Sequence, residues 1–219
     1  MKKEQHMFRR TEDFAFARML EDNWRDVLEE YRLVARQLHD WPETQYYNGN
    51  WTTFGLYAFG HKRPANCALC PRTTRLVEKI PGMVMAGFSR LAPGTHILPH
   101  QGYRGWARYV LRCHLGLIVN EQCGLRVGDE TRRWEEGKTL IFCDAFEHEA
   151  WNVGDAERVV LLLDVRNPEF RWRLLNPDLT PEIEQYILEQ WSDMGINDKM
   201  HYWAWRLFNY RQRRHRRFG

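Results

Sequence analysis

Two histidines and one arginine stand out because their side chains could join metal binding to anion binding. His100 lies within residues 99–102, and His148 lies within residues 146–149. Arg158 follows His148 by ten residues and begins a long apolar run. Imidazole is a suitable ligand for Fe(II), and a guanidinium binds a carboxylate through two parallel hydrogen bonds. The three residues predict a metal centre with an anion bound beside it.

A single histidine carries little weight, because a histidine in an apolar protein is more often a hydrogen-bonded core residue than a ligand. The prediction depends on a fold that brings His100 and His148 together. His100 follows a turn at residues 92–95, and His148 comes just after an apolar segment at residues 140–142. Both are expected at the open end of one β-barrel, with Arg158 on the next long strand.

The chain from residue 51 onwards has the pattern of an antiparallel β-protein. Short segments rich in apolar, β-branched and aromatic residues alternate with polar or glycine-containing turns. Many such strands without long helices between them are typical of a sandwich or barrel. The expected strands cover residues 51–59, 84–91, 110–119, 124–127, 131–134, 139–142 and 159–165.

Helices are expected on both sides of this β-region. Apolar residues recur at steps of three and four in residues 11–38, which predicts a helix capped by Thr11 and packed against a sheet. Thr180 followed by Pro181 is a typical helix start, with threonine as the N-cap and proline in the first turn. This signal predicts a second long helix over residues 177–194.

The composition indicates a folded protein of a reducing compartment. Hydrophobic residues make up 43% of the 219 residues, which excludes a disordered chain. No apolar run approaches the roughly 20 residues that a membrane-spanning helix needs, and the N-terminus lacks the apolar stretch of a secretory signal. The number of cysteines, five, is odd, and no secretory signal accompanies them, which argues against a disulfide framework. The sequence therefore predicts a cytoplasmic protein.

Positive charge is concentrated at the C-terminal end. From residue 206 onwards there are six arginines and no acidic residue, and removing these six charges would change the formal net charge from +3 to −3. Several aromatic residues precede or accompany the arginines. Such a tail is consistent with a membrane-surface element, a nucleic-acid-binding arm, or an aromatic lid or dimer contact with a solvated basic end. Nucleic acid is the least favoured partner.

Three segments resemble a known family. They are residues 88–100 (FSRLAPGTHILPH), residues 112–117 (RCHLGL) and residues 144–152 (DAFEHEAWN). Together with the segments around them, they resemble the aspartyl/asparaginyl β-hydroxylase family of Fe(II)- and 2-oxoglutarate-dependent dioxygenases over about residues 12–170. The resemblance implies a mainly β fold, a double-stranded β-helix of the jelly-roll, cupin-like type, with flanking N- and C-terminal helices.

The resemblance implies an unusual iron site. His100 and His148 would bind Fe(II), as the spacing of the histidines already suggests. Related oxygenases with a different ligand set have a carboxylate two residues after the first histidine, where this chain has Gly102. Absence of that carboxylate is normal in the β-hydroxylase family, with water in its place, so Gly102 supports the resemblance.

The resemblance also implies roles for residues around the iron. Arg158 would pair with the distal carboxylate of the cosubstrate 2-oxoglutarate, which Ser89 and His114 would also contact. Trp51 would form a wall of the pocket, and Arg112 would bind a carboxylate of the substrate. Arg112 and His114 alternate along one expected strand, so both would face the same side of the sheet. Tryptophans such as residue 134 are interpreted as core packing.

The expected organisation is a single domain over residues 1–219. Residues 1–42 would provide N-terminal helical support, residues 51–170 would form the jelly-roll catalytic core, and residues 177–219 would form a C-terminal helix with a basic aromatic tail. The sequence makes no prediction about the oligomeric state.

The implied reaction is O2-dependent hydroxylation of an unactivated C–H bond, with 2-oxoglutarate converted to succinate and CO2. The implied substrate is an Asp- or Asn-like amino acid, a peptide or another carboxylated small molecule. Two basic positions associated with gripping aspartate are Gly87 and Val110 in this chain, so the acyl chain of a lipid is an alternative substrate. An Fe/2-oxoglutarate halogenase and a non-catalytic jelly-roll binding module are also consistent with these residues.

Overall fold

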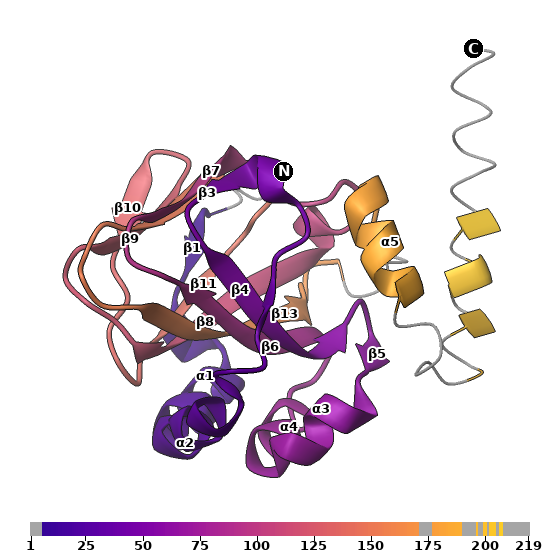
Figure 1. The fold of residues 1–219 in the computed structure, drawn as a ribbon, viewed down its shortest axis with the longest axis horizontal. Coiled ribbons are helices and arrows are strands. Elements are labelled where there is room, and N and C mark those ends of the chain that lie inside the picture. Colours follow the sequence, from indigo (N-terminus) through magenta and orange to yellow (C-terminus); the bar gives the residue numbers. More distant parts are fainter. Residues whose placement is uncertain are drawn as a thin grey trace.

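Two antiparallel sheets form the centre of the molecule in this computed structural model (Figure 1). The structure describes residues 6–170, 177–189, 196, 199–200, 202–204 and 206–207. The larger sheet has the order β1 (Phe8–Arg9), β11 (Thr139–Phe142), β8 (Val110–Ile118), β13 (Arg158–Arg166), β6 (Met83–Leu91), β4 (Trp51–Ala58) and β2 (His39–Asp40), with β5 (His61–Lys62) paired to β4. The smaller sheet has the order β10 (Glu130–Arg132), β9 (Cys123–Val127), β12 (His148–Asn152), β7 (Thr95–His100) and β3 (Tyr47–Asn48). The mainly β, jelly-roll expectation is confirmed.

Strand β13 illustrates how the sequence divides its residues between the two faces of the larger sheet. Side chains alternate along a strand, so every second residue faces the same way. One set packs with the outer helices, and these residues are Val159, Leu161, Leu163 and Val165. The other set turns toward the smaller sheet and includes Val160 and Leu162, together with the charged Arg158 and Asp164. A continuous apolar run is therefore needed, because β13 is covered on both faces.

Four helices cover the outer face of the larger sheet (Figure 1). They are α1 (Ala15–Asp22), α2 (Trp24–Val34), α3 (Pro64–Leu69) and α4 (Pro71–Val77). The single helix predicted over residues 11–38 is wrong in detail. A short 3-10 turn occupies Thr11–Asp13, Thr11 makes no capping bond, and the helix is interrupted at Asn23. The Asn23 side chain donates to the carbonyl of Met19 (2.8 Å), a local bond that competes with helical continuation.

The predicted apolar stripe is nevertheless the buried face of these helices. Leu20, Val27, Tyr31 and Val34 are each 1% exposed or less. Helix α2 is also joined to α4 by a buried carboxylate. Glu30 accepts hydrogen bonds from the backbone N–H groups of Arg72 (2.8 Å) and Thr73 (2.7 Å) in the first turn of α4, where a helix has unsatisfied donors.

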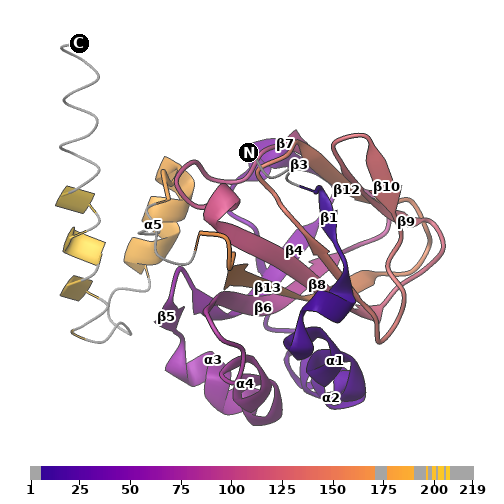
Figure 2. The ribbon, with the colours of Figure 1, turned by 180° about the vertical axis from the view of Figure 1, so that it is seen from behind.

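Helix α5 (Pro181–Glu189) lies apart from the other four, beside the open side of the barrel (Figures 1 and 2). The helix begins at Pro181 and not at residue 177 as predicted, but the Thr180–Pro181 start signal is confirmed, since the Thr180 hydroxyl accepts a hydrogen bond from the N–H of Ile183 (3.4 Å). The predicted continuation over residues 190–194 lies outside the described residues, as does most of the arginine-rich tail.

The strands begin earlier than the predicted core boundary at residue 51, because β1, β2 and β3 all precede it. Strand β1 extends the larger sheet through its pairing with β11, and β3 extends the smaller sheet through its pairing with β7. Strands β7 and β12 were not among the predicted strands. Both carry histidine and other polar residues at alternate positions, so their apolar pattern is weak.

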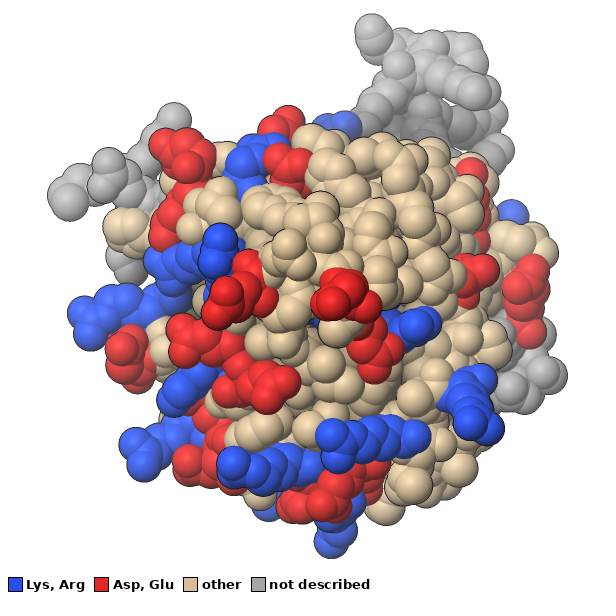
Figure 3. All heavy atoms as spheres, turned by 60° about the vertical axis from the view of Figure 1, so that its left-hand side comes forward, with Lys and Arg blue, Asp and Glu red and all other residues tan. Residues whose placement is uncertain are grey.

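Charged side chains of both signs are interspersed over the face in Figure 3, beside a broad area without charge. This face therefore has no extended patch of one sign. Among the described residues, no helix is long and apolar enough to cross a membrane.

Candidate active site

His100 and His148 lie side by side on neighbouring strands of the smaller sheet. His100 is the last residue of β7, His148 is the first residue of β12, and the two are register partners with ring centroids 4.3 Å apart. The Nδ1 atom of each ring is held by a backbone carbonyl two residues earlier, Leu98 for His100 (2.7 Å) and Phe146 for His148 (3.0 Å). Donation to a carbonyl requires the proton on Nδ1, which leaves the Nε2 lone pair available to a metal.

The surroundings of both imidazoles favour the neutral form. Burial lowers the pKa of His100, and Arg112 lowers it further. Burial lowers the pKa of His148 to about 3, and the neighbouring His100 contributes to the shift. A metal ligand must be unprotonated, so these surroundings favour cation binding over proton binding at the histidine pair.

The third protein ligand of the common triad has no space here. A side chain at residue 102 would bring its Cβ within 2.6 Å of the Asp144 carboxylate and 2.9 Å of Ala107. The Gly102 N–H donates to the backbone carbonyl of Asp144 (2.8 Å), which fixes this close approach. Among the described residues there is no group of three side chains that could hold a metal. The donor set fits a two-histidine centre whose other positions take non-protein ligands.

A second group of buried donors lies between the sheets. Arg158 at the start of β13 is 1% exposed and His114 on β8 is 7% exposed. The Arg158 Nε and the His114 Nε2 have no hydrogen-bond partner within the described part of the chain. Trp134 donates from Nε1 to Nδ1 of His114 (3.3 Å), so His114 must carry its proton on the unpaired Nε2. The site therefore presents two buried N–H donors, one from Arg158 and one from His114, to which a ligand could supply the acceptor.

The charge of Arg158 is equally uncompensated. Its guanidinium stacks over Trp134 (4.7 Å) and makes one long bond to the carbonyl of Ser89 (3.4 Å), but it forms no ion pair with any described carboxylate. Burial lowers the pKa of Arg158 to about 10, and burial together with Arg158 holds the pKa of His114 well below its usual value. Leaving a buried cation unpaired is costly, so this pocket fits a bound carboxylate.

The His100–His148 pair and the buried donors of His114 and Arg158 belong to one site. The Phe142 ring lies between them and contacts both groups. Its centroid is 5.1 Å from that of His114 and 5.9 Å from that of His148. Trp51 donates from Nε1 to Oγ of Ser89 (3.0 Å), and this pair forms the wall on the β4–β6 side. The structure thus brings together all of the predicted iron and cosubstrate residues.

Arg112 also lies at the site, and its charge is already matched. Its Nε and one terminal nitrogen bind both oxygens of Asp164 (2.8 and 2.9 Å), and another terminal nitrogen lies 3.0 Å from Asp144 without hydrogen-bonding geometry. Both aspartates are fully buried. Binding of a substrate carboxylate by Arg112 stays a prediction, and such a substrate would meet an arginine that is already paired with Asp164.

Asp144 is expected to make the protein less stable as pH rises toward neutrality. Burial raises the pKa of this carboxyl to about 7, although Arg112 opposes the shift. A folded-state pKa above the unfolded value means stabilisation that is complete in acid and is lost as pH rises through the folded pKa. Relative to Asp144→Asn, the wild-type free energy of unfolding should fall by about 1–3 kcal/mol between about pH 5 and pH 8. Urea titrations at both pH values measure this difference, and a constant difference would contradict the raised pKa.

Two residues of the site were missed in the sequence. Trp134 packs in the core, as the sequence interpretation had it, but it also contacts both Arg158 and His114, and this role at the site was not foreseen. Tyr46, just before β3, stacks on His100 with ring centroids 5.4 Å apart. Nothing in the local pattern distinguishes either residue from an ordinary core aromatic.

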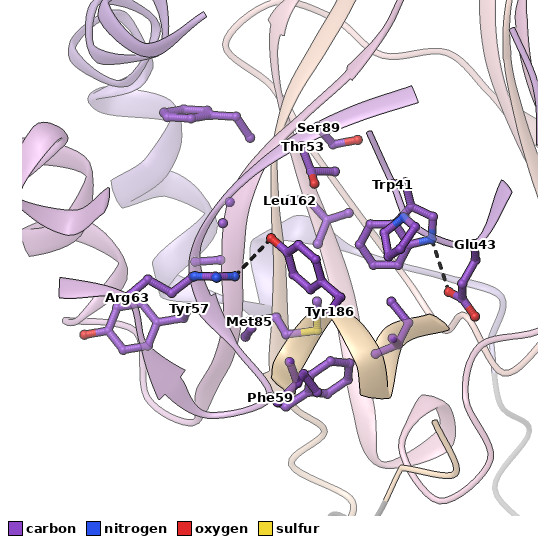
Figure 4. A pocket seen from close by; sticks show the side chains of 18 of the residues that line it. Trp41, Glu43, Thr53, Tyr57, Phe59, Arg63, Met85, Ser89, Leu162 and Tyr186 are labelled. Atoms are coloured by element: carbon purple, nitrogen blue, oxygen red, sulfur yellow. Dashed lines mark hydrogen bonds between the residues drawn. The ribbon is translucent and has the colours of Figure 1, made fainter. Parts of the chain in front are cut away.

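An apolar pocket runs from His100 to α5, and Figure 4 shows part of its lining. Its floor is the inner face of β4, β6 and β13, with side chains such as Thr53, Met85 and Leu162. The far wall comes from α5, whose residue Tyr186 accepts a hydrogen bond from Arg63 (3.0 Å) and lies under its guanidinium (5.2 Å). Helix α5 thus covers a part of the barrel interior that the smaller sheet leaves open.

Comparison with known sequences identifies the family of this chain. Residues 21–168 match the family described as aspartyl/asparaginyl beta-hydroxylase, and the chain belongs to this family. It is 45% identical over 146 residues to the ornithine lipid ester-linked acyl 2-hydroxylase of Rhizobium tropici, which covers 62% of this chain and 50% of that protein. It is 37% identical over 160 residues to the aspartyl/asparaginyl beta-hydroxylase of Mus musculus, which covers 68% of this chain and 21% of that protein. The chain spans half or less of the length of these curated relatives.

Solved structures with a similar arrangement have low sequence identity. A prolyl hydroxylase in complex with a hypoxia inducible factor peptide fragment, from Trichoplax adhaerens, has a TM-score of 0.47 and 12% identity, and covers 69% of this chain and 81% of that one. A non-heme alpha ketoglutarate dependent epimerase from nogalamycin biosynthesis has a TM-score of 0.47 and 14% identity, and covers 67% of this chain and 72% of that one.

Proposed function

We propose that this protein is an Fe(II)- and 2-oxoglutarate-dependent hydroxylase. The observation that carries the proposal is the pairing of two neutral histidines, each with a free Nε2, with a buried and uncompensated arginine nearby. His100 and His148 would hold the iron. Arg158 and His114 would bind the distal carboxylate of 2-oxoglutarate through donors that have no partner among the described residues.

The bound iron and cosubstrate would supply the oxidising chemistry that inserts an oxygen atom from O2 into a C–H bond. The chain's own contribution is binding, orientation and exclusion of water. Carbonyl bonds at both Nδ1 atoms fix the rings of His100 and His148. Tyr46 covers the ring of His100. Trp51 together with Ser89 closes the pocket on the side of β4 and β6.

For the substrate, we propose the acyl chain of a lipid. The pocket beyond the histidines is mainly apolar, and the positions that would grip aspartate by the family resemblance are the uncharged Gly87 and Val110. Arg112, at the histidine end of the pocket, is already paired with Asp164 through two hydrogen bonds. The relative from Rhizobium tropici is named as an acyl 2-hydroxylase, in agreement with this substrate class.

Two glycines would leave room for the acyl chain of the substrate to cross the sheet. Gly55 on β4 and Gly87 on β6 are register partners, and both line the pocket. With no side chain at either position, the floor is lowered there. A Cβ at Gly87 would strike the carbonyl oxygen of Phe54 (2.7 Å), whereas a Cβ at Gly55 would meet only Arg63 at ordinary contact distance (3.6 Å).

Gly55→Leu is therefore expected to fill the pocket without straining the backbone. We expect kcat/KM for a long-chain acyl lipid to fall by at least about tenfold, because a misfit of a single methylene group in an apolar pocket already changes it by about 10–200-fold. Substrate-free turnover of 2-oxoglutarate should be unchanged, because Gly55 does not contact the cosubstrate site. Mass spectrometry of the lipid and succinate formation measure the two quantities. Unchanged lipid hydroxylation would contradict an acyl chain in this pocket.

The direct test of the function supplies Fe(II), 2-oxoglutarate and isotopically heavy O2 together with an acylated aminolipid. The expected product is heavier by one labelled oxygen atom. An Asp- or Asn-containing peptide in the same assay tests the other substrate class. Product that requires chloride and contains it would support a halogenase instead.

A further inference from the structure

The α5 side of the apolar pocket carries a cation. Arg63, between β5 and α3, lines the pocket and is partly buried. Its guanidinium donates from Nη1 to the hydroxyl of Tyr186 on α5 (3.0 Å) and lies over the ring of the same residue (5.2 Å). Figure 4 shows Arg63 pointing toward Tyr186 from the side of the pocket opposite Trp41 and Glu43. The cation therefore faces the space that a substrate would enter.

The charge of Arg63 is available to a ligand. Lys62 and Arg112 line the same pocket, but Lys62 lies 2.6 Å from Glu78 and Arg112 lies 2.8 Å from Asp164. Arg63 forms no ion pair with any carboxylate in the described part of the chain, and its contact with Tyr186 is with a neutral group. A cation at the edge of an apolar pocket is stabilised most by an anion that enters with the substrate.

Tyr186 offers a second donor at the same point. Its hydroxyl oxygen accepts the hydrogen bond from Arg63, so its own proton can be donated to another group. No described side chain or carbonyl accepts that proton. The remaining guanidinium N–H groups and the phenol O–H together suit the oxygens of a carboxylate or a phosphate.

We propose that Arg63 and Tyr186 bind the anionic headgroup of the substrate, a carboxylate or a phosphate, away from the carbon that is oxidised. The inference deepens the proposed acyl-chain hydroxylation and rests on it for the identity of the reaction. The substrate class is then an anionic amphiphile that is held by its charged end and oxidised on its apolar part.

A row of paired residues crosses the larger sheet from this anion site to the proposed cosubstrate donors. The Cδ atom of Arg63 lies 3.6 Å from the position that a Cβ of Gly55 would occupy. Gly55 pairs with Gly87, Gly87 with Leu162, and Leu162 with His114. Neighbouring strands lie about 4.8 Å apart, so three strand spacings separate Gly55 from His114 by about 14 Å. The row between them has no charged side chain, which suits the apolar part of an amphiphile.

The test is isothermal titration of the full chain with decanoate, decyl phosphate and uncharged decanol, without iron or 2-oxoglutarate. Wild type should bind at least one of the two anions more tightly than decanol, and the tighter anion identifies the headgroup. Arg63→Gln should raise the dissociation constant of that anion by at least about tenfold, the effect of losing a hydrogen bond to a charged group. Decanol should bind wild type and Arg63→Gln equally, because it has no charge to lose a partner.

Two further variants separate headgroup binding from support of α5. Tyr186→Phe keeps the ring under Arg63 and removes only the O–H donor, so it should weaken binding of the anion by about two- to tenfold. Arg75→Gln makes the same charge change on α4, at an exposed arginine outside the pocket lining whose Nε donates to the carbonyl of Pro71 (3.2 Å). This control should keep the wild-type affinity for all three probes. Thermal unfolding identifies any variant that does not fold, and Tyr186→Phe carries the test if Arg63→Gln is one.

Three outcomes would overturn the proposal. One is equal anion affinity in wild type and Arg63→Gln. Another is a loss of decanol binding by the same factor as anion binding, which would mean that Arg63 only holds α5 in place. The third is a wild type that binds neither anion more tightly than decanol. Absence of an iron–2-oxoglutarate absorption band in wild type would contradict the proposed function instead, because these titrations contain neither iron nor cosubstrate.

Discussion

Replacing His148 with alanine is expected to abolish catalysis by removing one of the two proposed protein ligands to iron. Loss of a hydrogen-bond partner behind a ligand already costs about ten- to hundredfold in metal affinity, so loss of the ligand itself should weaken Fe(II) binding by at least about a hundredfold. Anaerobic equilibrium dialysis measures the affinity, and succinate formation measures the turnover. Both should fall, since no third protein ligand lies nearby in the described chain.

His96→Ala is the matched control for His148→Ala. His96 lies on β7, the same strand as His100, but its side chain is 39% exposed and its Nε2 pairs with Glu149 (2.7 Å). Iron affinity and turnover should be close to wild type in this variant. If the two variants bound iron equally well, His148 would not be a ligand.

Replacing Arg158 with glutamine should remove most of the affinity for 2-oxoglutarate. Truncating one member of a buried charge pair costs about 2–5 kcal/mol, which corresponds to a dissociation constant raised by about thirtyfold to several thousandfold. Arg158 suits this estimate because its charge is buried and makes no described ion pair. Isothermal titration with Mn(II) in place of Fe(II) measures the constant without turnover.

Arg90→Gln controls for the loss of an arginine near the same sheet. Arg90 follows Ser89 on β6, is half-exposed, and pairs with Glu157 (2.6 Å) on the side away from the pocket. It should leave 2-oxoglutarate affinity unchanged. A second readout is thermal stability: excess 2-oxoglutarate should raise the unfolding temperature of wild type and Arg90→Gln, and leave that of Arg158→Gln unchanged. Equal shifts in all three would contradict the role of Arg158.

The strands that could be predicted are those whose composition reflects burial. Strands β8 and β13 are buried on both faces and appear as long apolar runs, so their residues were predicted almost to the ends. Strands β7 and β12 carry the two iron-binding candidates and face solvent on the other side, which weakened their pattern. The break at Asn23 depends on a side-chain bond to the preceding turn, and apolar periodicity continues through it undisturbed.

The parts of the candidate site that could be predicted are the residues whose type and spacing match the family. A histidine pair and an arginine at a family spacing could be assigned from sequence, and the geometry brings them together. Partners that depend on packing could not be assigned. The stacking of Trp134 on Arg158 and the pairing of Arg112 with Asp164 join residues far apart in sequence. The pocket wall formed by α5 likewise depends on where that helix packs.

The central claim is that the histidine pair and Arg158 form one iron and 2-oxoglutarate site. The most direct measurement is an anaerobic titration of the protein with Fe(II) followed by 2-oxoglutarate, observed by visible absorption. Chelation of iron by the keto acid gives a weak charge-transfer band. We expect this band in wild type, its loss in His148→Ala, and a much higher 2-oxoglutarate requirement in Arg158→Gln. Folded wild-type protein that bound both components without the band would contradict the claim, and the non-catalytic binding module would then be the better account.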